Sequence, residues 1–180
     1  YAVSGKQYSE KYIDQNGDFI SLISSGGEAS TSQAAVSAFS AVFKELAKQG
    51  FEILCIVMSS RLSGIYSSAS IAAKEAGKAK VVVVDSQTTA GGLAMLVKRA
   101  RTLIDEGLSL KQTAEKLMVL REKVGIAFSV DDMEALRKSG RIGMVRQSIG
   151  TILNVRPILM LEDGAVVSCG IARGKADQIR

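Results

Sequence analysis

The sequence has no histidine and no tryptophan, and only 5% of its 180 residues are aromatic. Because histidine supplies the usual zinc ligands and the base of most catalytic triads, both kinds of site are excluded within this chain. The two cysteines, Cys55 and Cys169, form no CxxC pair and no disulfide framework, although one disulfide between them stays open. Cys55 lies inside an apolar run and is best explained as a small core residue. We therefore expect no metal and no cofactor.

Long apolar runs are also missing, because none approaches the roughly 18 residues that a membrane-spanning helix needs. The first residues lack the charged, apolar and small-residue order of a signal peptide, so we expect a cytoplasmic protein. The net charge is only +5. A solvated basic surface explains it better than nucleic-acid binding does, since no aromatic residue lies among the basic ones to stack on bases. The basic residues gather loosely at Arg137, Lys138, Arg141, Arg146 and Arg156.

From residue 36 onward, helical patterns alternate with apolar runs of strand length. Buried strands are predicted over 51–58, 80–84 and 124–130, because these runs are nearly continuous and rich in β-branched residues. Helices are predicted between them, and Ser109 with Gln112 forms a capping box that starts one of these helices. The alternation predicts an α/β fold in which helices cover both faces of a parallel sheet.

The pattern changes after the third predicted strand. Residues 141–154 have helical periodicity, and two apolar runs then flank Asp163-Gly164, a pair typical of a β-hairpin turn. Antiparallel pairing at this point indicates the start of a second, α+β domain. We place the domains at 1–145 and 146–180, and we expect the second to be incomplete because a single hairpin is not stable alone.

Hydroxyl-rich loops precede three of the predicted helices, at 30–33, 59–64 and 85–92. In open parallel sheets, ligands bind beyond the carboxyl ends of the strands, and helix N-termini attract anions. Serine and threonine are also ordinary N-caps, which explain any one loop taken alone better than a ligand does. Three such loops together favour a site for a carboxylate or a phosphate.

Two other interpretations of these loops are weaker. Asp85 ends a strand, as the ribose-binding acidic residue of dinucleotide-binding folds does. The GxGxxG loop that precedes such a residue is missing here, so we expect Asp85 to brace its own loop. Residues 59–64 do not match GxSxG, and no histidine exists to act as a base. Their serines are therefore better hydrogen-bond donors than nucleophiles.

Several segments taken together resemble the DegV family, namely 31–33, 59–69, 81–86, 128–142 and 152–173. The resemblance implies a two-domain α/β protein that binds a long-chain fatty acid between its domains and has no catalysis of its own. It also implies a bacterial partner, a separate fatty-acid kinase subunit that converts the presented carboxylate into an acyl phosphate. The family's first strand has no counterpart before Tyr1, and much of its second domain has none after Arg180, so we expect an incomplete family member.

Matched position by position, the resemblance implies that Thr31 and Ser63 hold the carboxylate, with Ser60 and Gly64 beside them. Neutral donors at helix starts suit such a head group, and an apolar tunnel would bury the tail. The charged positions that the resemblance places near the ligand or the kinase partner are Arg141 and Arg173.

Two alternatives stay open at this point. The same hydroxyl loops would also suit a phosphotransferase-type enzyme subunit acting on a small anionic substrate, and ATP turnover by the isolated protein would favour that hypothesis. A basic protein that binds nucleic acid would instead bind duplex DNA in a salt-dependent manner.

Overall fold

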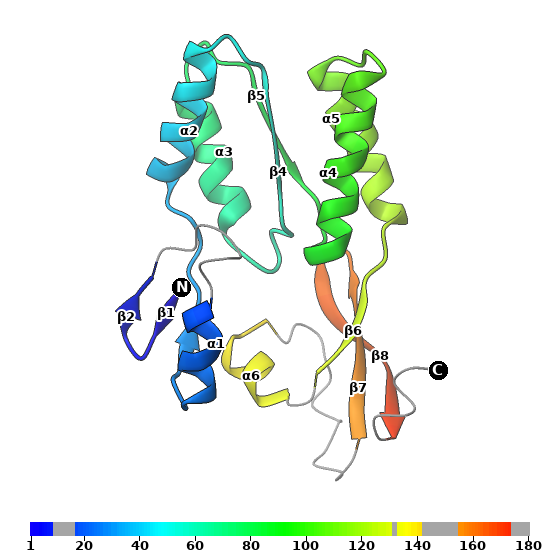
Figure 1. The fold of residues 1–180 in the computed structure, drawn as a ribbon. Coiled ribbons are helices and arrows are strands. Elements are labelled where there is room, and N and C mark those ends of the chain that lie inside the picture. The colour runs from blue at the N-terminus through cyan, green and yellow to red at the C-terminus, as the bar shows by residue number, and fades with distance from the viewer. Residues whose placement is uncertain (9–16, 131–132, 142–154, 174–180) are drawn as a thin grey trace. The chain divides into compact units, whose positions relative to one another are not determined.

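The computed structural model describes residues 1–8, 17–130, 133–141 and 155–173 (Figure 1). The chain divides into two compact units, Tyr1–Gln33 and Ala34–Arg180. The predicted domain boundary between residues 145 and 146 lies outside the described residues, so it stays a prediction, as does the helix predicted over 141–154. Among the described helices, none is both long and apolar enough to cross a membrane.

The described part of the smaller unit contains a three-stranded antiparallel sheet in the order β2-β1-β3, together with the helix α1. The first two strands are joined by a turn at Ser4 and Gly5, both of which have positive φ. Val3 is buried in this unit, and a Cβ on Gly27 would lie only 2.7 Å from its side chain. The elements are β1 (Ala2–Val3), β2 (Lys6–Gln7), α1 (Gly17–Ser24) and β3 (Ala29–Ser30).

The larger unit begins with a parallel pair of strands, β4 (Ile53–Val57) and β5 (Val81–Asp85), aligned residue by residue from Ile53↔Val81 to Val57↔Asp85. Both strands were predicted from their apolar runs. Figure 1 shows this pair between two helix pairs, α2 with α3 and α4 with α5. These helices are α2 (Val36–Lys48), α3 (Ile65–Glu75), α4 (Ala90–Asp105) and α5 (Leu110–Leu120).

Alternation along the strands explains why both faces of the parallel pair are covered. Successive side chains of a strand point to opposite faces. Ile53 therefore packs with Phe43 of α2 in one core cluster, whereas Val84 packs with Leu96 of α4 and Leu117 of α5 in another. The predicted α/β arrangement is confirmed. The capping box at the start of α5 is confirmed as well, with both of its hydrogen bonds present.

The last described elements form an antiparallel sheet in the order β6-β7-β8. The predicted hairpin is confirmed, since Asp163 and Gly164 have φ of 49° and 79° and join β7 to β8. Positive φ at both central residues is the signature of the tight turn that such pairs favour. The strands of this sheet are β6 (Ala127–Ser129), β7 (Val155–Glu162) and β8 (Ala165–Arg173), and the short helices η2 (Arg121–Lys123) and α6 (Met133–Lys138) precede and follow β6.

One prediction about this region was wrong. The strand predicted over 124–130 exists as β6, but it pairs antiparallel with β7 instead of joining the parallel sheet. Its side chains explain the difference, because Phe128 packs on the cluster around Leu159 while the alternate residue Ser129 is exposed. One buried face and one exposed face are typical of an antiparallel sheet, whereas parallel strands are covered on both faces.

Candidate functional site

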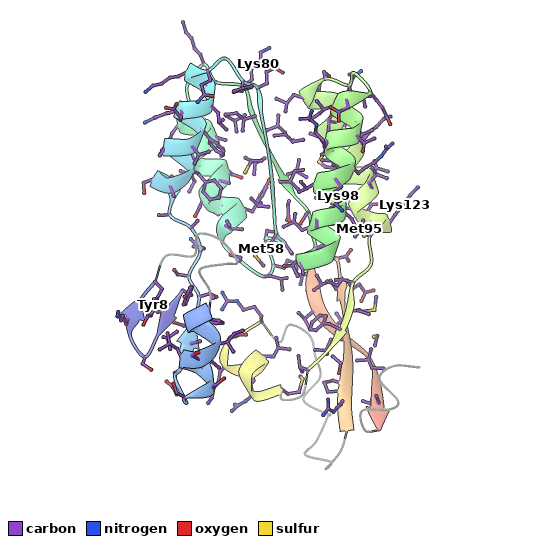
Figure 2. The ribbon with its side chains drawn as sticks, in the orientation of Figure 1. Tyr8, Met58, Lys80, Met95, Lys98 and Lys123 are labelled. Atoms are coloured by element: carbon purple, nitrogen blue, oxygen red, sulfur yellow. The ribbon has the colours of Figure 1, made fainter. Side chains whose placement is uncertain are left out.

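The loops that follow β4 and β5 lie side by side at the carboxyl edge of the parallel sheet. The amide of Ser59 donates to the carbonyl of Thr88 over 2.9 Å, and the amide of Ser60 donates to Asp85 Oδ1 over 3.2 Å. Met58, labelled in Figure 2, marks this end of β4, and Lys80 marks the opposite end of the sheet. Two of the three hydroxyl-rich loops on which the predicted anion site depends, 59–64 and 85–92, are therefore neighbours.

Ser59 is fully buried at this edge, with an exposed fraction of 0%. Its hydroxyl donates to the carbonyl of Gly164 over 2.7 Å and accepts the amide of Arg61 at 3.2 Å. With its proton donated and the oxygen already accepting, this side chain is committed to the protein itself. Ser59 is therefore a structural residue and not a ligand donor.

Ser63 and Ser60 differ from Ser59 in having donor capacity left. Ser63 is half-buried and its Oγ accepts the amide of Ile65 at 3.3 Å, while its hydroxyl donates to no group among the residues that the structure describes. Ser60 is exposed, and its hydroxyl makes no hydrogen bond within the described part of the chain. Both predicted donors are thus able to bind an acceptor such as a carboxylate.

The start of α3 adds backbone donors to these hydroxyls. Gly64 is the N-cap of the helix and has no side chain to cap it, so of the first-turn amides only that of Ile65 is held by a side chain among the described residues, the Oγ of Ser63. The first-turn amides of a helix have no partner within the helix, and they carry a partial positive charge. Ser63, Gly64 and the first turn of α3 therefore form a group of neutral donors beside the exposed Ser60.

Asp85 braces the loops, as predicted. Its Oδ1 accepts the amides of Ser60 and of Gln87, the latter over 3.0 Å, while Arg121 Nη1 donates to its backbone carbonyl over 2.8 Å. The buried Ser86 hydroxyl donates to the carbonyl of Thr88, 3.2 Å away. The side chains of Asp85 and Ser86 are thus used within the loop, whereas the buried Thr88 Oγ1 has no hydrogen-bond partner among the described residues.

The remaining predicted residues are distributed over the chain. Arg141 lies beside the serine loop, because its Nε donates to the carbonyl of Leu62 over 3.1 Å. Arg173 ends β8, where its backbone pairs with Val155. Thr31 belongs to the smaller unit and is exposed there. The role of each of these residues in binding stays a prediction.

Two cavities lie away from the serine loop. One of about 340 Å³ is in the smaller unit, where Val3 and Gly27 are among the residues that line it. The other, of about 470 Å³, is at the amino edge of the parallel sheet and is lined by Glu52, Lys80 and Ser109. The Lys80 ammonium is hydrogen-bonded to the Glu52 carboxylate, which raises the pKa of this lysine. Neither cavity includes a predicted site residue.

Comparison with known sequences identifies the protein family of this chain. A family profile described as "Uncharacterised protein, DegV family" matches residues 2–180. This chain belongs to the DegV family. A DegV domain-containing protein of Staphylococcus aureus is 32% identical over 178 residues, which make up 99% of this chain and 63% of that protein. The chain therefore spans less than two thirds of the length of this curated DegV relative.

Solved DegV structures are similar in fold. A DegV family protein from Thermus thermophilus, described by its fatty-acid binding, is 36% identical with a TM-score of 0.78, over 87% of this chain and 56% of that chain. A protein from Eubacterium ventriosum described as binding stearic acid is 27% identical with a TM-score of 0.80, over 90% and 57% of the respective chains. Both relatives are described as fatty-acid-binding proteins, and the predicted family is confirmed.

Proposed function

We propose that this DegV chain is a cytoplasmic carrier that binds a long-chain fatty acid. The observation that carries the proposal is its likeness to solved DegV proteins, 36% and 27% identical, that are described as binding fatty acids. The donor chemistry of the serine loop supports the same function. The carrier itself has no catalytic role in this proposal.

The carboxylate is held by neutral donors. Ser63 supplies a hydroxyl proton, and the first turn of α3 supplies the backbone amides that follow Ile65, because the N-cap Gly64 has no side chain to occupy them. Ser60 supplies a second hydroxyl, and Thr31 contributes a third. Hydrogen bonds to a charged acceptor are stronger than neutral ones, so a few such donors orient the head group without a lysine or arginine.

The tail supplies most of the affinity. Burying one methylene contributes about 0.8 kcal/mol, so a chain of about sixteen carbons gains roughly 10 kcal/mol before the costs of ordering it. A single lost hydrogen bond at the head costs about 1.5–3 kcal/mol when the partner is charged. Head-group substitutions should therefore weaken binding without abolishing it.

The carrier presents its ligand to a separate kinase subunit. In this proposal the bound carboxylate stays accessible at the loop edge, where Ser60 is exposed. A carboxylate oxygen attacks the γ-phosphorus of ATP held by the partner, and ADP leaves. In this proposal Arg141, whose Nε donates to the carbonyl of Leu62, contacts the acyl phosphate or the partner, and Arg173 is a second candidate for that contact.

The test begins with the purified chain. Mass spectrometry after denaturation should detect co-purified acyl chains, and palmitate should raise the melting temperature. Ser63→Ala should then raise the Kd for palmitate about tenfold, since about 1.5 kcal/mol is lost. Ser67→Ala is the matched control, because Ser67 is an exposed serine one turn further along α3. If no acyl chain is recovered and palmitate leaves the melting temperature unchanged, the proposal is wrong.

A further inference from the structure

The turn of the β7–β8 hairpin packs tightly against the loops of the parallel sheet. Gly164 in this turn is buried, and a Cβ at this position would lie 2.3 Å from Ser59 Oγ and 3.3 Å from the Cα of Gln87. The Gly164 carbonyl accepts the Ser59 hydroxyl over 2.7 Å. The hairpin and the serine loop therefore have little freedom to move independently at this contact.

Ser59 is also the residue around which the serine loop is built. Its carbonyl accepts the amides of Leu62 and Ser63, over 3.0 Å and 3.1 Å, and its Oγ accepts the amide of Arg61. Its own amide is bound to the carbonyl of Thr88. A displacement of Ser59 would therefore be passed directly to Ser63.

We infer that Ser59 is a positioning residue for the ligand carboxylate. Its buried hydroxyl couples the position of the β7–β8 turn to the position of the donors on Ser60 and Ser63. This inference rests on the proposed function, because it concerns how the same carboxylate is oriented. Ser59 does not touch the ligand, and it acts through the loop.

The physical basis is the precision that hydrogen-bond donors require. A binding constellation works when its groups are held within about 0.5 Å of the productive geometry by supporting contacts. Without the Ser59 hydroxyl, the buried Gly164 carbonyl and the Arg61 amide both lose a partner. Unsatisfied buried groups are costly, so the loop should shift to recover a partner for them.

The experiment follows the carboxylate itself. Palmitate labelled with ¹³C at its carboxyl carbon is bound to the chain, and its carboxyl resonance and Kd are measured for each variant. Ser59→Ala should move the bound resonance and raise the Kd about fivefold, as expected for about one misplaced hydrogen bond. Ser129→Ala is the matched control, because it removes a hydroxyl–carbonyl bond to Pro157 of 2.8 Å that does not touch the serine loop. This control should keep the wild-type resonance and Kd.

Each outcome decides the inference. A folded Ser59→Ala variant with an unchanged resonance and Kd would overturn it. If that variant does not fold, Ser59→Cys, which keeps a weak donor, should move the resonance by a smaller amount, and an unmoved resonance would overturn the inference equally. If wild-type protein shows no bound carboxylate, the proposed function fails instead. In that case the backbone amide NMR chemical shifts of Ser60 and Ser63 are compared between wild type and Ser59→Cys. Changed shifts would support the coupling of the loop to Ser59, and unchanged shifts would overturn it.

Discussion

Gly164→Ala should be among the most destabilising single-methyl additions in this chain. The new Cβ would lie 2.3 Å from Ser59 Oγ and 3.3 Å from Gln87 Cα, a backbone atom that cannot rotate away. Forcing an extra methyl into a packed site costs about 1–3 kcal/mol. The φ of 79° adds about 1 kcal/mol, because a side chain disfavours this left-handed region. Together these give a loss of about 2–4 kcal/mol in the free energy of unfolding.

Gly50→Ala separates the two contributions. Gly50 has a φ of 82°, almost the same as that of Gly164, but a Cβ there would meet no atom within 4 Å. This variant should lose only about 1 kcal/mol, the backbone contribution. The difference between the two variants therefore measures the contact between the hairpin and the serine loop.

A double-mutant cycle identifies the atom responsible. Ser59→Ala removes the oxygen nearest to the added methyl, so Gly164→Ala should cost about 1–2 kcal/mol less in the Ser59→Ala background than in wild type. Urea denaturation followed by far-UV circular dichroism gives the free energies of all four proteins. Equal losses for Gly164→Ala and Gly50→Ala, or strictly additive losses in the cycle, would refute the reasoning.

Two more predictions concern the cysteines and the cap of α5. N-ethylmaleimide at neutral pH should label the exposed Cys169 of the folded protein faster than the half-buried Cys55, because burial raises the pKa of the Cys55 thiol. Equal labelling rates of the two cysteines in folded protein would contradict this prediction. The same raised pKa means that the folded state loses stability as the pH rises above the ordinary thiol pKa, because the unfolded chain then releases a proton that the folded chain keeps. Ser109→Ala should cost about 1 kcal/mol in urea denaturation because the hydroxyl cap on the Gln112 amide is lost, whereas an unchanged midpoint would show that the cap adds no stability.

Local signals explain what could be predicted from the sequence. The capping box of Ser109 and Gln112 and the turn at Asp163-Gly164 both depend on residues a few positions apart, and both are present in the structure. The role of Asp85 was also predictable, because a side chain at the end of a strand reaches the amides of its own loop.

Non-local pairing explains what was not predicted. The apolar run of β6 indicates a buried strand, but it does not say which strand lies beside it, and β7 comes almost thirty residues later. The Ser59–Gly164 bond joins residues 105 positions apart. Serine in a helix-start loop and glycine in a hairpin turn each have a complete local explanation, so neither residue signals the other.

The buried hairpin turn also limits where the chain can be engineered. Loop tips are usually the sites that tolerate inserted residues best, because they are exposed and polar. The Gly164 tip is an exception, since any insertion there would separate β7–β8 from the Ser59 hydroxyl. A fluorescent reporter or an affinity tag belongs instead in the turn after α3, where Gly77 is exposed and a Cβ would meet no atom within 4 Å.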